Sequence, residues 1–77
     1  MARTPPMRHV ILAAIQERID SGDLSPGTRL PSISQLAEQY DCSAEPVRWA
    51  LDQLVGRGYL DSRQGVGYFV AARPPTA

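Results

Sequence analysis

Residues 32–58, SISQLAEQYDCSAEPVRWALDQLVGRG, decide the fold. Apolar residues recur at helical spacing in two runs, the first ending near Tyr40 and the second at the glycines that flank Arg57. Only a short turn around Cys42 separates the runs, because Ser43 already suits the N-cap position of the second helix. The segment therefore predicts two short helices joined by a tight turn, the arrangement of a helix-turn-helix.

Both of these helices are expected to begin with a serine cap. Ser32 and Gln35 have the spacing of a capping box, in which each side chain accepts a hydrogen bond from the backbone N–H of the other residue. Pro46 stands in the first turn of the second helix, where a missing N–H is tolerated. We therefore expect the hydroxyl of Ser43 to accept its hydrogen bond from the backbone N–H of Glu45.

The rest of the sequence adds one helix, a strand stub and a hairpin around this segment. In chain order, the expected elements are a helix over 7–21 closed by a glycine, a strand stub over 28–30, and strands over 59–62 and 67–71 joined by a loop over 63–66. The expected organisation is a flexible arm at residues 1–6, one domain at 7–71 and a flexible tail at 72–77. The predicted fold class is α+β, a winged helix-turn-helix with three helices, a short strand stub and a C-terminal β-hairpin wing.

Composition restricts the chain to a small module without catalytic chemistry. Its 77 residues, 43% of them hydrophobic and 21% charged, suffice for one compact core and leave no room for a second, ligand-sensing domain. A single cysteine excludes an internal disulfide, and with one histidine it makes no metal site. Since no nucleophile–base pair, supported carboxylate pair or nucleotide loop is present, we expect no enzyme activity and no cofactor.

Net charge does not by itself identify a partner. Eight acidic residues balance eight basic ones, whereas DNA-binding domains usually carry a basic excess for their phosphate contacts. Every basic residue is an arginine, a side chain that suits bidentate contacts with phosphate or guanine. The longest apolar run is far too short to span a membrane, and the reducing cytoplasm is the expected compartment.

The order of the elements is typical of DNA-binding domains. In a helix-turn-helix the second helix lies in the major groove with its first residues at base edges, a position that falls here to residues 43–57. A hairpin directly after that helix forms a wing, in which Gly65 and Gly67 let the backbone approach DNA closely. The backbone N–H groups at the starts of both helices suit phosphate oxygens. The sequence thus predicts a recognition helix over 43–57 and a wing near 63–68 on the flanking backbone of double-stranded DNA.

Four stretches of the chain together match the pattern of one family. They are GDLSPGTRLPS at residues 22–32, LAEQY at 36–40, VRWALDQL at 47–54, and the wing sequences GYL and GVGYFV at 58–60 and 65–70. In content, order and spacing they resemble GntR-type bacterial transcription regulators, from about Met7 to Val70. The resemblance implies a winged helix-turn-helix that binds operator DNA, usually as a dimer on a two-fold site. The sequence leaves dimerisation open, including pairing of two copies that takes place only on DNA.

The chain departs from that pattern at three positions where the family carries arginines that contact DNA. Ser34 stands where an arginine is common, Ala44 replaces an arginine at the start of the recognition helix, and Val66 replaces the arginine between the wing glycines. Two interpretations therefore remain open. In one, the domain binds DNA with altered specificity and lower affinity. In the other, the fold serves as a winged-helix module for protein–protein interaction, with Trp49 as a candidate anchor.

The candidate DNA contacts come from the helix starts, the recognition helix and the wing. They are Ser32, Ser34, Gln35, Ser43, Ala44, Glu45, Arg48, Arg63, Gly65, Gly67 and Tyr68. Arg48 and Arg63 are expected to bind phosphates. Ala44 suits contact with a thymine methyl group, and Glu45 suits a cytosine amino group. Gln35 is expected chiefly in its capping box.

The remaining aromatic and soft side chains are expected to be structural. Trp49 falls beside the buried stripe of the recognition helix, so packing at the core edge is its expected role. Alternation along the last strand assigns Phe69 to the core and leaves Tyr68 to reach DNA. His9 is expected on the surface, and Cys42 is expected to be a small buried residue of the turn.

Overall fold

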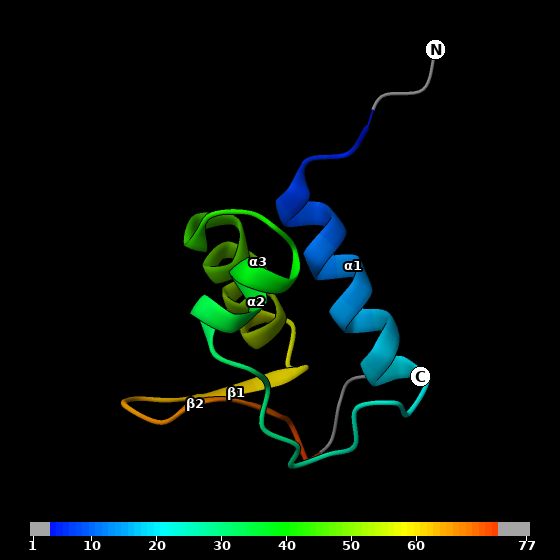
Figure 1. Ribbon diagram of the computed structural model, residues 1–77. Helices are drawn as coiled ribbons and strands as arrows, with labels where there is room; N and C mark the ends of the chain where they lie inside the picture. Colours follow the sequence, from blue (N-terminus) through cyan, green and yellow to red (C-terminus); the bar gives the residue numbers. More distant parts are fainter. Residues whose placement is uncertain (1–3, 73–77) are drawn as a thin grey trace.

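The computed structural model describes residues 4–72 and arranges them as three helices followed by a two-stranded hairpin (Figure 1). The elements are α1 (Met7–Asp20), α2 (Ile33–Gln39), α3 (Ala44–Gly56), β1 (Leu60–Arg63) and β2 (Gly67–Val70). The predicted winged helix-turn-helix is confirmed in element order and type. Of the predicted arm at 1–6 the structure describes residues 4–6, which are not helical, and of the predicted tail at 72–77 it describes Ala72; the rest lies outside the described residues.

α3 forms the centre of the core. Its apolar stripe is fully buried and consists of Val47, Ala50, Leu51 and Leu54. α1, α2 and β1 all pack against α3, and their buried side chains are Ile11, Leu12, Ile15, Ile19, Leu36, Ala37 and Leu60. The helical spacing of this stripe is the pattern that the sequence predicted. Its burial leaves the opposite face of α3 available for binding.

A tight turn joins α2 to α3. Asp41 adopts a φ of 53°, a left-handed conformation that aspartate tolerates better than most residues. The backbone N–H of Cys42 donates to the carbonyl of Ala37 at 2.9 Å, which satisfies one of the free carbonyls at the end of α2. Cys42 is half-buried rather than buried as expected, because it lies in this turn and only one side of it packs on the core.

The caps of α2 and α3 differ. At α2 the predicted capping box is present: the Ser32 hydroxyl accepts from the Gln35 N–H at 3.1 Å, and the Gln35 Oε1 accepts from the Ser32 N–H at 2.9 Å. At α3, Ser43 holds the N-cap position but its side chain makes no capping hydrogen bond, so the expected bond from Glu45 is wrong. Pro46 is the third residue of α3 and has no N–H. α3 therefore lacks the donor that the third residue of α2, Gln35, supplies to Ser32.

The two strands of the hairpin place alternate residues on its two faces. The antiparallel register sets Leu60 opposite Val70 and Ser62 opposite Tyr68. Leu60 and Val70 are buried, so the period of two puts Ser62 and Tyr68 on the same, core-facing side. The assignment of Phe69 to the core and of Tyr68 to the outside is therefore wrong: Tyr68 packs on the core, and Phe69 faces the other way.

The predicted strand stub lies along the free edge of β2. Arg29 and Phe69 form an isolated antiparallel bridge, and the N–H of Leu30 donates to the carbonyl of Tyr68 at 2.9 Å. This segment leads directly into α2 (Figure 1). The hairpin is therefore tied to the helix-turn-helix on the side away from β1.

The two serine caps provide a matched stability test. We expect Ser32→Ala to lower the free energy of unfolding by about 1 kcal/mol, because it breaks the capping box of α2. We expect Ser43→Ala to lower it by much less, because that hydroxyl caps nothing. Urea denaturation followed by circular dichroism measures both variants, and an equal loss in the two would contradict the assigned caps.

Candidate nucleic-acid interface

The outer face of α3 carries the polar side chains of the predicted recognition helix. Glu45, Arg48 and Asp52 are exposed, and they lie opposite the buried stripe. Ala44 begins the helix and is half-buried, so it offers only a small apolar surface. This face combines one guanidinium with two carboxylates, a mixture that favours selective hydrogen bonding over simple attraction to phosphate.

A hydrogen bond links this face to the wing. The Tyr68 hydroxyl donates to the Oδ1 of Asp52 at 3.0 Å, joining β2 to α3. Burial, and then the hydrogen bond and negative charge of Asp52, raise the pKa of the Tyr68 phenol, while the positive charge of Arg48 acts in the opposite direction. Tyr68, Asp52 and Arg48 therefore form one electrostatic cluster where the wing meets the recognition helix. The hydroxyl expected to reach DNA is engaged within this cluster.

The first turn of α2 presents a second group of predicted contacts. Ser32, Ser34 and Gln35 are all exposed. The capping box already uses the Ser32 hydroxyl and the Gln35 side-chain oxygen, as expected for Gln35. Ser34 takes no part in that box. Of these three residues, it is the one whose side chain has no capping role.

The wing contributes two glycines with positive φ and one stacked arginine. Gly65 and Gly67 adopt φ values of 77° and 141°, which only glycine accepts without strain, and Val66 between them is exposed at the tip. The Arg63 guanidinium lies over the Phe69 ring at 5.0 Å from its centroid. Arg63 and Phe69 thus share the face of the hairpin that points away from the core.

Arg29 is not among the contacts expected from the sequence. Its Nη2 donates to the carbonyl of Val66 at 2.7 Å, a contact between residues 37 positions apart. Arg29 is exposed, and it lines a groove between the start of α2 and the wing, together with Ser32, Ser34 and Gly67. Only the bridge between the strand stub and β2 brings it there, and no local pattern reveals that pairing.

Trp49 packs at the edge of the core, as expected. It is half-buried against the core cluster, with the His9 ring at 5.3 Å from its own ring and the Arg8 guanidinium at 5.4 Å from its centroid. His9 itself is exposed, in agreement with the expected surface position. The indole is therefore covered on the α1 side and does not project as a free anchor.

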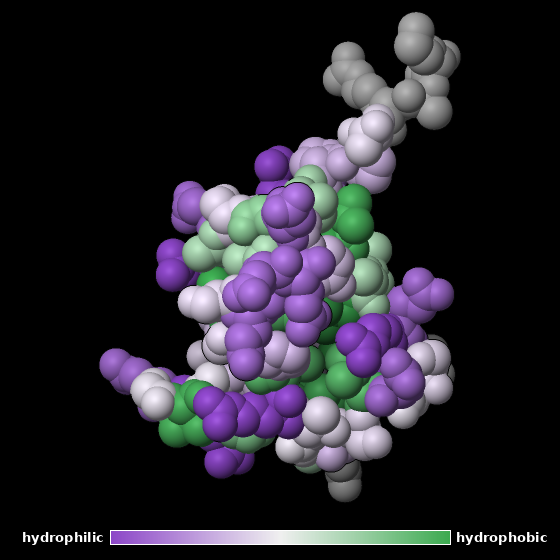
Figure 2. Space-filling view, in the orientation of Figure 1, coloured by the Kyte–Doolittle hydropathy of each residue, from purple (hydrophilic) through white to green (hydrophobic). Residues whose placement is uncertain are grey.

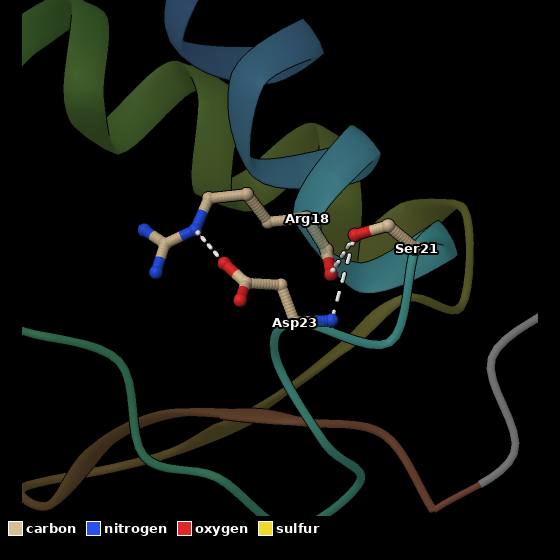
Figure 3. Close-up of polar contacts among 3 residues, drawn as sticks. All are labelled: Arg18, Ser21 and Asp23. Carbon is tan, nitrogen blue, oxygen red and sulfur yellow. Dashed lines mark hydrogen bonds and ion pairs between the residues drawn. The ribbon is translucent and has the colours of Figure 1, made fainter.

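The described arginines are unevenly paired. Within residues 4–72 the ion pair joins Arg18 to Asp23 at 3.0 Å, close to the end of α1 (Figure 3). That end of α1 and the tip of the hairpin lie on opposite sides of the molecule in Figure 1. Figure 2 shows hydrophilic surface over the helices and along the hairpin. The guanidinium groups of Arg29, Arg48 and Arg63 carry no carboxylate partner in the described part of the chain.

Two other kinds of site are not found in residues 4–72. No group of three or more histidine, cysteine, aspartate or glutamate side chains is arranged to hold a metal ion. No helix in this part of the chain has the length and apolar character needed to cross a membrane.

Comparison with known proteins identifies the family. The model of the bacterial regulatory proteins of the gntR family matches residues 8–70. The chain belongs to the gntR family. The probable rhizopine catabolism regulatory protein MocR of Rhizobium meliloti is 38% identical over 72 residues, which cover 94% of this chain and 15% of MocR. The mannosyl-D-glycerate transport/metabolism system repressor MngR of Escherichia coli is 42% identical over 65 residues, covering 84% of this chain and 27% of MngR.

Solved structures of gntR-family DNA-binding domains have the same fold. The DNA-binding domain of AraR, crystallised in complex with operator ORR3, superposes with a TM-score of 0.87 at 31% identity, over 92% of this chain and 86% of that one. YtrA from Sulfolobus acidocaldarius, a GntR-family transcription factor, gives a TM-score of 0.83 at 32% identity, over 92% and 74% of the two chains. The chain spans only about 15–27% of the length of MocR and MngR.

The contact between Tyr68 and Asp52 makes a titration test. We expect Asp52→Asn to lower the pKa of the Tyr68 phenol toward its ordinary value, because the carboxylate that disfavours the phenolate is gone. Since the folded-state pKa is raised, the stability that this shift represents is present at neutral pH and is lost as the pH rises through that pKa. NMR titration of the tyrosine ring signals measures the shift. Asp61→Asn, on the outer face of β1, is the control, and an unchanged Tyr68 pKa in Asp52→Asn would refute the assigned contact.

Proposed function

We propose that this chain is the DNA-reading domain of a bacterial transcription regulator that binds operator duplex. The observation that carries the proposal is the match over residues 8–70 to a family of regulators, together with the close superposition on a domain crystallised with its operator. The exposed face of α3 supports insertion into the major groove, with Ala44, Glu45 and Arg48 toward the bases and phosphates. The hairpin then meets the flanking backbone through Arg63, Gly65 and Gly67.

The remaining predicted contacts surround this face. Ser32, Ser34 and Ser43 lie at the starts of α2 and α3, where hydroxyl and backbone N–H groups suit phosphate oxygens. In this proposal Tyr68 and Gln35 act indirectly. Tyr68 holds Asp52 in place, and Gln35 holds the first turn of α2. Binding therefore uses the surface where α2, α3 and the wing converge.

We also propose a regulatory outcome, a compartment and a number of copies for the domain. The relative MngR is named as a repressor, which supports repression as the regulatory outcome. A regulator of this kind acts in the bacterial cytoplasm, where its DNA lies. We extend the proposal to two copies of the domain that pair on DNA at a two-fold operator. The stoichiometry of the protein–DNA complex tests this pairing.

The alternative of a protein-interaction module receives less support from the structure. A docking hot spot is expected to expose a large aromatic anchor at the centre of an apolar patch. Trp49 is instead half-buried and flanked by His9 and Arg8. The observations around Trp49 thus favour a structural role, and the DNA-reading role remains the better account of the outer face of α3.

The first experiment measures DNA binding without assuming an operator. Fluorescence anisotropy against a pool of random duplexes, at about 50 mM and about 200 mM salt, gives affinity and salt dependence. Selection and sequencing of the bound fraction then gives the motif. We expect enrichment of one motif, above all a palindrome, and steep weakening with salt. Absence of binding at the lower salt concentration would reject the proposal and favour the protein-interaction module.

Arg48 provides the residue-level test of this proposal. We expect Arg48→Ala to weaken binding by a similar factor on all duplexes and to reduce the salt slope by about one, because it removes one phosphate contact. The matched control is Arg18→Ala, which removes an exposed arginine that pairs with Asp23 at the end of α1. If both variants bind like the unmodified chain, Arg48 is not a DNA contact.

A further inference from the structure

The loop at the tip of the wing has no charged side chain of its own. It consists of Gln64, Gly65 and Val66, ahead of Gly67 at the start of β2. A wing that contacts DNA needs positive charge, since the phosphate backbone supplies most of the affinity. In addition to Arg63 at the end of β1, Arg29 brings a charge to this tip from outside the hairpin.

Two contacts hold Arg29 against the wing. Its backbone pairs with Phe69 on the free edge of β2, and its Nη2 donates to the Val66 carbonyl at 2.7 Å. A hydrogen bond from a charged donor at this distance is strong and directional. The guanidinium is therefore fixed beside the tip, although Arg29 and Val66 are 37 residues apart in sequence.

Gly67 lies next to the Arg29 guanidinium. A Cβ on Gly67 would lie 3.5 Å from Nε and 3.8 Å from Nη2 of Arg29, which are ordinary van der Waals distances. The φ of Gly67, +141°, is one that other residues rarely adopt. The glycine is therefore required by the turn of the wing, and the guanidinium of Arg29 packs beside it.

The seated guanidinium retains donors for a ligand. An arginine carries five N–H donors, and one of them is used on the Val66 carbonyl. Within residues 4–72 no carboxylate pairs with Arg29; the acid on the same face of the hairpin, Asp61, lies opposite Phe69. Arg63 lies over the Phe69 ring on this face, and Phe69 is also the residue whose backbone pairs with that of Arg29.

We propose that Arg29 is a DNA-backbone contact of the wing, whose guanidinium, seated on the Val66 carbonyl, binds a phosphate beside the major-groove site. This inference rests on the proposed function and extends it to a residue from the loop before α2. The groove between the first turn of α2 and the wing, lined by Arg29, Ser32, Ser34 and Gly67, receives the phosphate. The strand stub thereby adds the charge of Arg29 to that of Arg63 on the hairpin.

The test separates the charge of Arg29 from its hydrogen bond. Arg29→Ala is measured on the selected duplex over a range of salt concentrations, and we expect weaker binding and a salt slope reduced by about one. This variant also loses the hydrogen bond to Val66. Arg29→Gln removes the charge but keeps an N–H donor for the Val66 carbonyl. We expect it to reduce the salt slope as Arg29→Ala does.

The control is Arg57→Ala, which removes an exposed arginine whose Nη1 donates to the Gln16 Oε1 at 3.0 Å, outside the proposed DNA surface. It should leave the salt slope unchanged. An unchanged slope in Arg29→Ala, with normal binding by the unmodified chain, would overturn the role of Arg29 and leave the proposed function intact. An unchanged slope in Arg29→Gln would also overturn it, because a structural clasp alone would then explain the loss in Arg29→Ala. Failure of the unmodified chain to bind any duplex would overturn both proposals.

Discussion

The hydrogen bonding of β2 along both of its edges is the constraint on which the arrangement of the interface depends. β1 occupies one edge, and the segment over residues 27–30 occupies the other, where the N–H of Gly27 donates to the carbonyl of Val70 at 2.9 Å and the N–H of Val70 donates to the carbonyl of Thr28 at 2.8 Å. A two-stranded hairpin alone is marginally stable in water. Because the third segment leads directly into α2, the wing and the helix-turn-helix keep one relative position.

This constraint explains how a chain with no net charge can carry a surface suited to DNA. Affinity depends on where guanidinium groups are held, and Arg29, Arg48 and Arg63 are held without carboxylate partners within the described residues. The hydrogen bond from Tyr68 to Asp52 engages one of the carboxylates on the outer face of α3. Under the proposed function, the guanidinium groups bind phosphates and the polar groups of α3 select among bases.

The sequence predicted what depends on local pattern and missed what depends on distant pairing. The helical stripe of α3 and the capping box of Ser32 followed from spacing alone. The cap of Ser43 was wrong: with Pro46 unable to donate, Glu45 was the expected donor, and the Ser43 side chain makes no capping hydrogen bond. Tyr68 was placed on the wrong side because the register of the hairpin, rather than hydrophobicity, decides which face is buried. Arg29 was overlooked because only the bridge to β2 brings it to the wing.

We propose that the first turn of α2, the outer face of α3 and the wing form one continuous DNA-binding surface. NMR titration of the isotope-labelled chain with its selected duplex tests this surface most directly. We expect the largest shift changes on the backbone amides of residues 32–35, Ala44, Glu45, Val47, Arg48 and 63–67 and on the side-chain Nε–H of Arg29. Changes confined to the N-terminal half of α1 and to Trp49, with the wing unaffected, would contradict it.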